Sequence, residues 1–232
     1  MEFVRRTLTE WPLLPVRLVR TRLGVWWLVL VGALWWLQRG DPRADPVGIA
    51  VLAGTLGAVV CVAGLAASTA DRAALAHRLL HPTTPAAITT GRWLGAVSGA
   101  TLAICALSGY AAWSTHAASV GVGAPLAGVV AAVSASASAL ALVLVGGHPA
   151  AVLAFLWFLF VSTMSPEAML GLGRHGVPAT ILAGMLEVGP SVWRYREVAS
   201  GNLGAAAHAV LWVGAGLSIA TWRVARRGGR RL

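Results

Sequence analysis

One long stretch of this chain contains no Asp, Glu, Lys or Arg. It runs from Trp93 to Pro166 in a chain of 232 residues. A soluble protein of this size needs charged side chains over its surface and cannot leave so long a stretch without them. One crossing of a bilayer takes about 20 apolar residues, so the stretch is long enough for about three crossings. The sequence therefore predicts a protein embedded in a membrane.

The composition agrees with this prediction and limits the chemistry. Hydrophobic residues make up 57% of the chain and charged residues 11%, and the mean hydropathy is +0.74. These values are typical of a polytopic membrane protein. The net charge is +10, yet all 18 basic residues are Arg. A phosphate-binding P-loop needs a Lys that reaches the phosphates, so we expect no ATP hydrolysis by this chain alone.

Six apolar runs predict an all-α protein with six transmembrane helices in a single domain, residues 23–232. Paired tryptophans, Trp26 with Trp27 and Trp35 with Trp36, are expected to mark the two interfaces of the first, short span. The predicted spans are about Leu23–Gln38, Pro46–Ala70, Trp93–Trp113, Leu126–Val145, Ala150–Met164 and Leu203–Trp222.

Two further segments accompany the spans. Residues 1–22 alternate arginines with Trp and Leu and contain two prolines, which predicts an amphipathic helix lying in the headgroup plane. Residues 165–202 carry several charges around the apolar run Val177–Leu186, which has about half the length of a span. This segment predicts a re-entrant or interfacial helical hairpin between the fifth and sixth spans.

The arginines are divided unevenly between the two ends of the spans. Those of residues 1–22, 71–92 and the C-terminal tail fall together, and only Arg39, Arg43, Arg174, Arg194 and Arg196 fall opposite. The positive-inside rule makes the first group cytoplasmic. We therefore expect a multi-pass protein of a bacterial plasma membrane, with both termini in the cytoplasm and the 165–202 hairpin outside. Because the basic residues cluster at the ends of apolar runs, they predict contact with lipid headgroups and no nucleic-acid partner.

The cytoplasmic connection 71–92 is the most informative segment for function. An apolar stripe at helical spacing is followed by a Pro-containing turn. Thr83 or Thr84 can cap a second helix that has Pro85 at its first position and continues into the third span. The segment predicts a rigid helix–turn–helix that docks a soluble partner, although an ordinary polar loop is the alternative.

The residues of this segment carry a family resemblance. The run Leu79-Leu80-x-Pro82-Thr83-Thr84-Pro85-x-x-Ile88-x-x-Gly91-Arg92 resembles the coupling-helix region of type-2 ABC transporter permeases. The layout of spans, basic ends and hairpin is similar too, as is Leu186–Pro190 followed by Arg194 and Arg196. The chain departs from the family in having Ala73 and Ala74 where Glu and Gly are common.

The resemblance implies the transmembrane permease subunit of an ATP-driven exporter, which moves a hydrophobic or amphipathic substrate such as a drug, lipid or peptide outward. It implies a dimer with a second permease, identical or homologous, and a separate ATPase subunit that binds ATP and Mg. The chain itself is then a transporter subunit and not an enzyme, with no cofactor or metal of its own. The residues implied in coupling are Arg72, Arg78, Leu79, Leu80, His81, Pro82, Thr83, Thr84, Pro85 and Arg92.

Weaker candidates lie elsewhere in the chain. Ser134 and Ser138 repeat along the fourth span and predict either a substrate path or close helix packing. Glu167 and Glu187 lie near the outer face, where an ionisable residue serves a path or is simply solvated. Cys61 and Cys105 lie in apolar runs and are expected to behave as small buried hydrophobes without a disulfide or metal.

Two other classes of function stay open. Ser98 and His208 lie in predicted spans and raise the possibility of an intramembrane serine protease. Ser98 has Ala96, not Gly, two residues before it, which departs from the pattern of rhomboid proteases. A membrane anchor or assembly protein that transports nothing is the other class.

Overall fold

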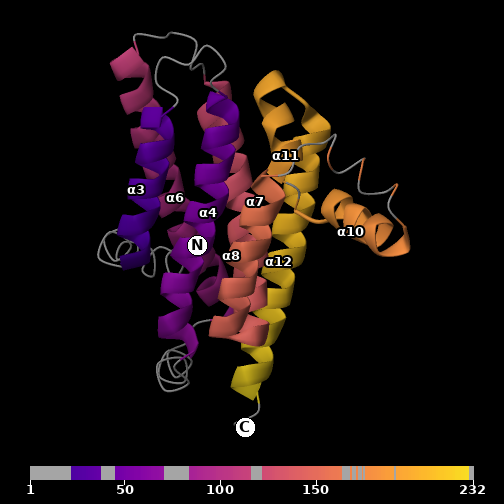
Figure 1. Cartoon of the computed structure of the whole chain (residues 1–232). Coiled ribbons are helices and arrows are strands. Elements are labelled where there is room, and N and C mark those ends of the chain that lie inside the picture. Colours follow the sequence, from indigo (N-terminus) through magenta and orange to yellow (C-terminus); the bar gives the residue numbers. More distant parts are fainter. Residues whose placement is uncertain are drawn as a thin grey trace.

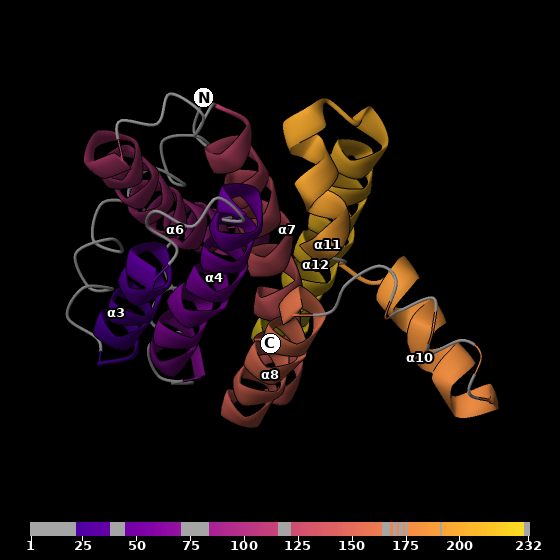
Figure 2. The same ribbon diagram turned by 45° about the horizontal axis from the view of Figure 1, so that its top comes forward.

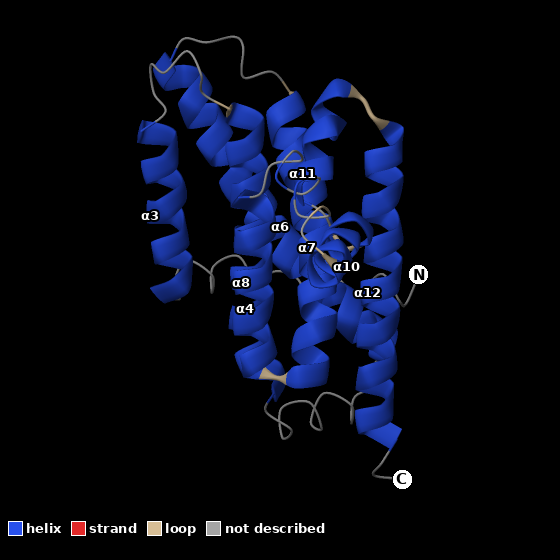
Figure 3. Ribbon diagram, turned by 45° about the vertical axis from the view of Figure 1, so that its right-hand side comes forward, coloured by secondary structure: helices blue, strands red, loops and turns tan. Residues whose placement is uncertain are grey.

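The computed structural model describes residues 22–37, 45–70, 84–115, 122–163, 168, 171, 174, 176–190 and 192–229. Every regular element in these ranges is helical, as expected, and the long helices run side by side with α3 at one edge and α12 at the other (Figures 1 and 3). The elements are α3 Arg22–Leu37, α4 Pro46–Ala70, α6 Pro85–Thr115, α7 Gly123–Gly146, α8 His148–Thr163, α10 Val177–Val188, α11 Val192–Tyr195, the 3-10 helix η1 Arg196–Ser200 and α12 Leu203–Gly229.

Three of these helices contain an apolar stretch long enough to cross a membrane. They are Pro46–Ala63 in α4, Gly123–Gly146 in α7 and Leu203–Arg226 in α12. The helices α3 and α8 each have 16 residues, fewer than the roughly 20 of a full crossing. The long apolar helices are consistent with a membrane protein, while the count of six spans stays a prediction. The predicted interfacial helix of residues 1–22 lies outside the described residues.

The helix α7 occupies the centre of the bundle. It contacts α4, α6, α8, η1 and α12, and Figure 2 shows it between α4 and α12. Its buried residues, which include Ala127, Ala131, Ala135 and Ser134, lie on all sides of the helix. Side chains this small let neighbouring helices approach closely, which is how helices gain packing energy where no water is expelled.

Glycines bring the backbones of α4 and α7 into direct contact. A Cβ atom on Gly128 would lie 2.6 Å from the carbonyl oxygen of Ala50, and one on Gly54 would overlap the carbonyl oxygen of Gly128. A close contact of the same kind joins α7 to α12, because a Cβ on Gly216 would lie 2.7 Å from the carbonyl of Ala137. The crossings at these positions therefore leave no space for a side chain.

One sequence-based expectation about exposure was wrong. Cys105 was expected to be buried, but it lies exposed on α6, whereas Cys61 is buried as expected. Trp27 is 4% exposed and lies against Gly57, with its indole Nε1 donating to the carbonyl of Ala53 at 3.1 Å, and its place at a membrane interface stays a prediction. An apolar run does not reveal which of its faces meets another helix and which faces outward, and this explains the error at Cys105.

The glycine contact between α4 and α7 gives a first prediction. Gly128→Ala should destabilise the bundle by about 1–3 kcal/mol, because the added methyl group forces two packed backbones apart. Thermal unfolding of the purified protein in detergent measures the loss. Gly214→Ala is the matched control, since a Cβ at this helical glycine meets no atom within 4 Å. Equal melting temperatures for the two variants would show that the crossing is not close-packed.

Candidate functional site

The end of the predicted coupling segment is the start of α6. Residues 71–83 lie outside the described residues, and with them Arg72, Arg78, Leu79, Leu80, His81, Pro82 and Thr83. Thr84 caps the helix, since its Oγ1 accepts a hydrogen bond from the amide of Ala87 at 3.2 Å, and Pro85 is the first helical residue. The predicted cap at Thr84 is confirmed. The second helix of the segment and the third predicted span form one continuous helix.

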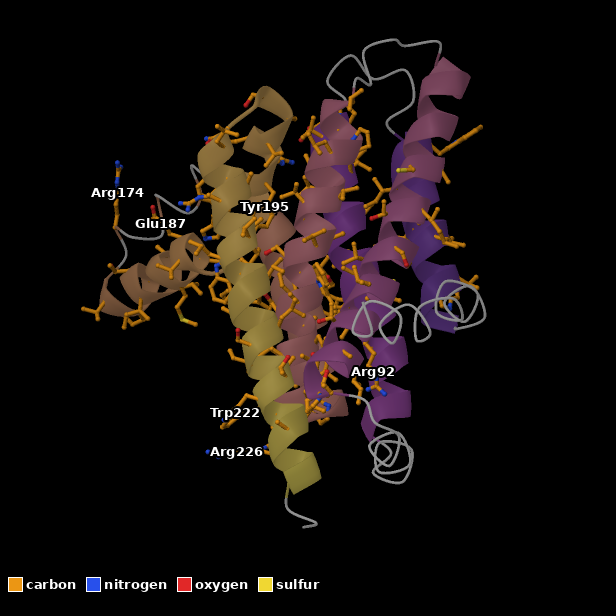
Figure 4. The ribbon with its side chains drawn as sticks, turned by 180° about the vertical axis from the view of Figure 1, so that it is seen from behind. Arg92, Arg174, Glu187, Tyr195, Trp222 and Arg226 are labelled. Atoms are coloured by element: carbon orange, nitrogen blue, oxygen red, sulfur yellow. The ribbon has the colours of Figure 1, made fainter. Side chains whose placement is uncertain are left out.

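The first turns of α6 are bound to two other helices. Thr89 Oγ1 lies 2.8 Å from Thr221 Oγ1 of α12, and the Trp93 indole Nε1 donates to the carbonyl of Val133 in α7 at 3.2 Å. Arg92, between them, is only 4% exposed and lies within the lower part of the bundle (Figure 4). If this end of α6 moved, its contacts with both α7 and α12 would therefore change.

A second polar cluster lies where the 165–202 segment meets the bundle. Ser134 Oγ of α7 lies 2.7 Å from the hydroxyl of Tyr195, which is 3.4 Å from Nδ1 of His208 on α12. Nε2 of His208 lies 3.2 Å from the carbonyl oxygen of Val188, and the Trp212 indole Nε1 donates to the same oxygen at 2.9 Å. These five residues are the hairpin anchor.

The hairpin anchor satisfies a need that helix geometry creates. The last carbonyl groups of a helix have no partner within the helix. Val188 is the last residue of α10, and Gly189-Pro190 ends the helix there, because Pro has no amide hydrogen to donate. His208 and Trp212 supply donors to its carbonyl from α12. The end of α10 is thus bound to α12 through side chains that lie one helical turn apart.

The chemistry of the groups fixes the direction of the hydrogen bonds. A carbonyl oxygen only accepts, so Nε2 of His208 carries the hydrogen. In a neutral imidazole Nδ1 then accepts from the Tyr195 hydroxyl, which in turn accepts from Ser134. Burial raises the pKa of Tyr195 to about 12, and the hydrogen bond with Ser134 lowers it by less, so the phenol stays protonated.

Only one end of α10 is held by the bundle. Leu186 is fully buried, whereas Val177 is 73% and Ile181 is 59% exposed. Figures 1 and 2 show the helix standing away from α12. The predicted helix at Val177–Leu186 is confirmed, and its placement as a re-entrant hairpin stays a prediction.

An ion pair attaches the 165–202 segment to α4. Arg196 Nη2 lies 2.7 Å from Asp45 Oδ2, while Asp45 Oδ1 accepts from the amide of Gly48 at 2.8 Å and caps α4. The guanidinium covers Gly48 so closely that a Cβ there would overlap it. Both partners are about half exposed, so the pair positions the segment more than it stabilises the fold.

The other sequence candidates have clear positions where they are described. Ser134 belongs to the hairpin anchor, and Ser138 is 7% exposed with its hydroxyl donating to the Ser134 carbonyl at 3.1 Å. Glu187 lies 3.8 Å from Arg194 with its side chain 70% exposed, pointing outward from α10 (Figure 4). Glu167 lies outside the described residues. No three His, Cys, Asp or Glu side chains come together as a metal site in the ranges that are described.

The pair considered for proteolysis has other hydrogen-bond partners. The hydroxyl of Ser98 donates to the carbonyl of Gly95 at 3.0 Å. Both ring nitrogens of His208 contact groups of the hairpin anchor. A nucleophilic serine needs a base within hydrogen-bond reach, so this geometry does not favour the protease.

An apolar groove of about 490 Å³ runs between α7 and α8. The sequence did not reveal it, because its lining consists of the same apolar side chains as the spans themselves. It is lined by Leu142, Ala150, Leu153, Ala154, Leu156, Trp157 and Phe160.

The hairpin anchor gives a second prediction. Tyr195→Phe should cost about 1–2 kcal/mol of stability, because it removes the hydrogen bonds of the hydroxyl with Ser134 and His208 and leaves these partners unsatisfied. In a double-mutant cycle with Ser134→Ala, the double variant should lose less stability than the sum of the two single losses, by about 0.5 kcal/mol or more. Chemical unfolding in detergent measures both, with Ser200→Ala as the control that removes an exposed hydroxyl. Strict additivity would mean that Ser134 and Tyr195 do not interact.

The chain was compared with known proteins. No protein-family model, curated protein or solved structure matches it.

Proposed function

We propose that this chain is the membrane-embedded permease subunit of an ATP-driven exporter. It works with a second permease and with a separate ATPase subunit that binds ATP and Mg, and it moves a hydrophobic or amphipathic substrate outward. It lies in a bacterial plasma membrane with both termini in the cytoplasm. The sequence resemblance at residues 79–92 motivates this proposal, and one structural observation carries it.

That observation is the continuity of α6. The helix begins at the capped Thr84-Pro85 pair, at the end of the segment that resembles a coupling helix, and runs unbroken to Thr115. Coupling between distant sites needs a stiff element whose movement changes packed contacts, because a flexible loop absorbs the displacement. Through Thr89 and Trp93 the same helix contacts α12 and α7.

The buried position of Arg92 refines its proposed role. At 4% exposure it is not available as a docking residue for the ATPase. We assign it to the transmission of movement from the coupling segment into the bundle. Direct contact with the partner is left to residues 72–85, of which Leu79 and Leu80 supply the apolar surface.

The hairpin anchor fits the opposite end of such a mechanism. It connects α7 and α12, two of the helices that α6 contacts, to the base of α10. A shift of α12 relative to α7 would change the chain Ser134–Tyr195–His208, which links α7 to α12 through Tyr195 of α11. In this proposal the coupling segment and the hairpin respond to one rearrangement at α7. The apolar groove beside α8 matches the class of substrate.

Replacement of Leu79 and Leu80 by Asp tests the proposal. Unpaired charges buried at an apolar interface should weaken association with the ATPase subunit by several kcal/mol, roughly a thousandfold or more. Co-purification of the ATPase and export should both be lost, while membrane insertion is retained. The wild-type chain purified alone should show no ATP turnover.

Val122→Asp is the matched control. It makes the same apolar-to-acidic change at the opposite end of the bundle, where Val122 is 82% exposed and precedes α7. An acidic residue at a helix N-cap is well tolerated. If the Leu79/Leu80 variant binds the ATPase and exports as the control does, the segment is an ordinary loop and the proposal fails.

A further inference from the structure

One face of α12 is exposed along most of the helix and ends in an aromatic and a basic residue. Leu211 is 72%, Ile219 46% and Trp222 49% exposed, and Ala215 and Arg226 are exposed as well. Spacings of four, four, three and four residues place these five side chains on one side of a helix. We call this set the α12 stripe. It passes from apolar to aromatic to basic toward the C-terminal end.

The last two members of the stripe form a pre-organised pair. The Arg226 guanidinium carbon lies 4.3 Å from the centroid of the Trp222 ring, the distance of a cation–π contact. Both side chains point away from the rest of the bundle (Figure 4). A guanidinium that stacks by its face keeps the N–H donors at its edge for a planar or tetrahedral oxyanion. The pair thus presents a positive charge in a restricted orientation.

Among the described residues, no carboxylate forms an ion pair with Arg226, so its charge is available to an external anion. No Asp or Glu follows Glu197 in the chain. In the part of the chain that the structure describes, Asp45 precedes α4, and Glu187 and Glu197 belong to the 165–202 segment. Glu187 lies away from the C-terminal end of α12 (Figure 4). Arg223 reaches a protein acceptor, since its Nε donates to the Leu144 carbonyl at 3.4 Å. The C-terminal end of a helix carries partial negative charge, so attraction of an anion here depends on the arginine side chains.

The order of groups along the stripe identifies the anion. Four residues of α-helix span about 6 Å, so the guanidinium lies about one helical turn beyond the indole. Tryptophan is enriched at the boundary between acyl chains and headgroups, and arginine just beyond it attracts anionic lipids. Apolar side chains at Leu211 and Ile219 continue the surface toward the acyl region. A free anion has no acyl chain, so it would make no use of the apolar surface at Leu211 and Ile219.

We propose that Trp222 and Arg226 bind the phosphate headgroup of an anionic phospholipid, with its acyl chains along the α12 stripe. This site is distinct from the coupling segment and from the hairpin anchor. It rests on the membrane embedding included in the proposed function, and not on transport.

Native mass spectrometry of the full chain tests the site. The protein is released from detergent micelles that contain equal amounts of phosphatidylglycerol and phosphatidylcholine, and the ratio of the two bound lipids is measured. Wild type should retain phosphatidylglycerol preferentially. Arg226→Gln should lower the preference about fivefold, the contribution of one basic residue near an anionic surface. Trp222→Ala should lower the preference for phosphatidylglycerol as well, because the Arg226 guanidinium would lose the indole ring on which it stacks.

Arg194→Gln is the matched control. Arg194 also stacks on a tryptophan, with its guanidinium carbon 5.5 Å from the Trp193 ring, but Glu187 lies 3.8 Å away and offers a carboxylate in place of a lipid. The control should keep the wild-type lipid ratio. Equal binding of the two lipids by wild type, or equal losses in the Arg226 and Arg194 variants, would overturn the site.

Two further experiments distinguish a wrong lipid site from a wrong membrane assignment. Millimolar inorganic phosphate should leave the bound phosphatidylglycerol in place, and full displacement would mean that the guanidinium binds free phosphate, contrary to the proposal. Extraction of cell membranes with alkaline carbonate should leave the chain in the pellet. A chain that is extracted would refute membrane embedding and with it the proposed function, whereas a retained chain without lipid preference refutes only this site.

Discussion

The close contact of α4 with α7 is the constraint on which the other contacts depend. Within a membrane, apolar side chains gain nothing by leaving lipid for one another, so helices associate through close packing and hydrogen bonds. Gly54 and Gly128 allow the two backbones to touch. This contact fixes α7 at the centre, where Ala137 meets Gly216 of α12 and the Val133 carbonyl meets Trp93 of α6. A larger residue at the first crossing would shift α7 and with it the partners of three helices.

Polar contacts then decide how the peripheral segments attach to this centre. Thr89 and Thr221 join α6 to α12 at one end of the bundle. At the other, the Tyr195 hydroxyl and the Val188 carbonyl join the 165–202 segment to α7 and α12. These bonds form between helices far apart in the sequence, and each requires its partners to be held within about 3 Å. The small-residue packing of α7 provides that precision, which is why we propose that movements at the two ends are coupled.

The sequence predicted features that depend on neighbouring residues in the chain. The start of α6 at Thr84-Pro85 follows from capping chemistry, and the helix at Val177–Leu186 follows from an apolar run between charges. It did not predict the partner of Tyr195 or the burial of Trp27, because these depend on which helices become neighbours. Tyr195 is one of only two tyrosines in the chain, and its place between Arg194 and Arg196 is the one sequence feature that indicates a special role. The exposure of Cys105 was missed for the same reason as the burial of Trp27.

The orientation of the bundle in a membrane is the central claim of the proposed function, and site-specific thiol labelling measures it most directly. In a background with Cys61 and Cys105 replaced by Ala, single cysteines are introduced at Glu2, Gly171 and Gly229, and intact cells are treated with a membrane-impermeant reagent. The account predicts labelling at position 171 alone, with positions 2 and 229 labelled only after the cells are opened. Labelling of positions 2 and 229 in intact cells, with 171 protected, would contradict it, because the coupling segment would then face away from ATP.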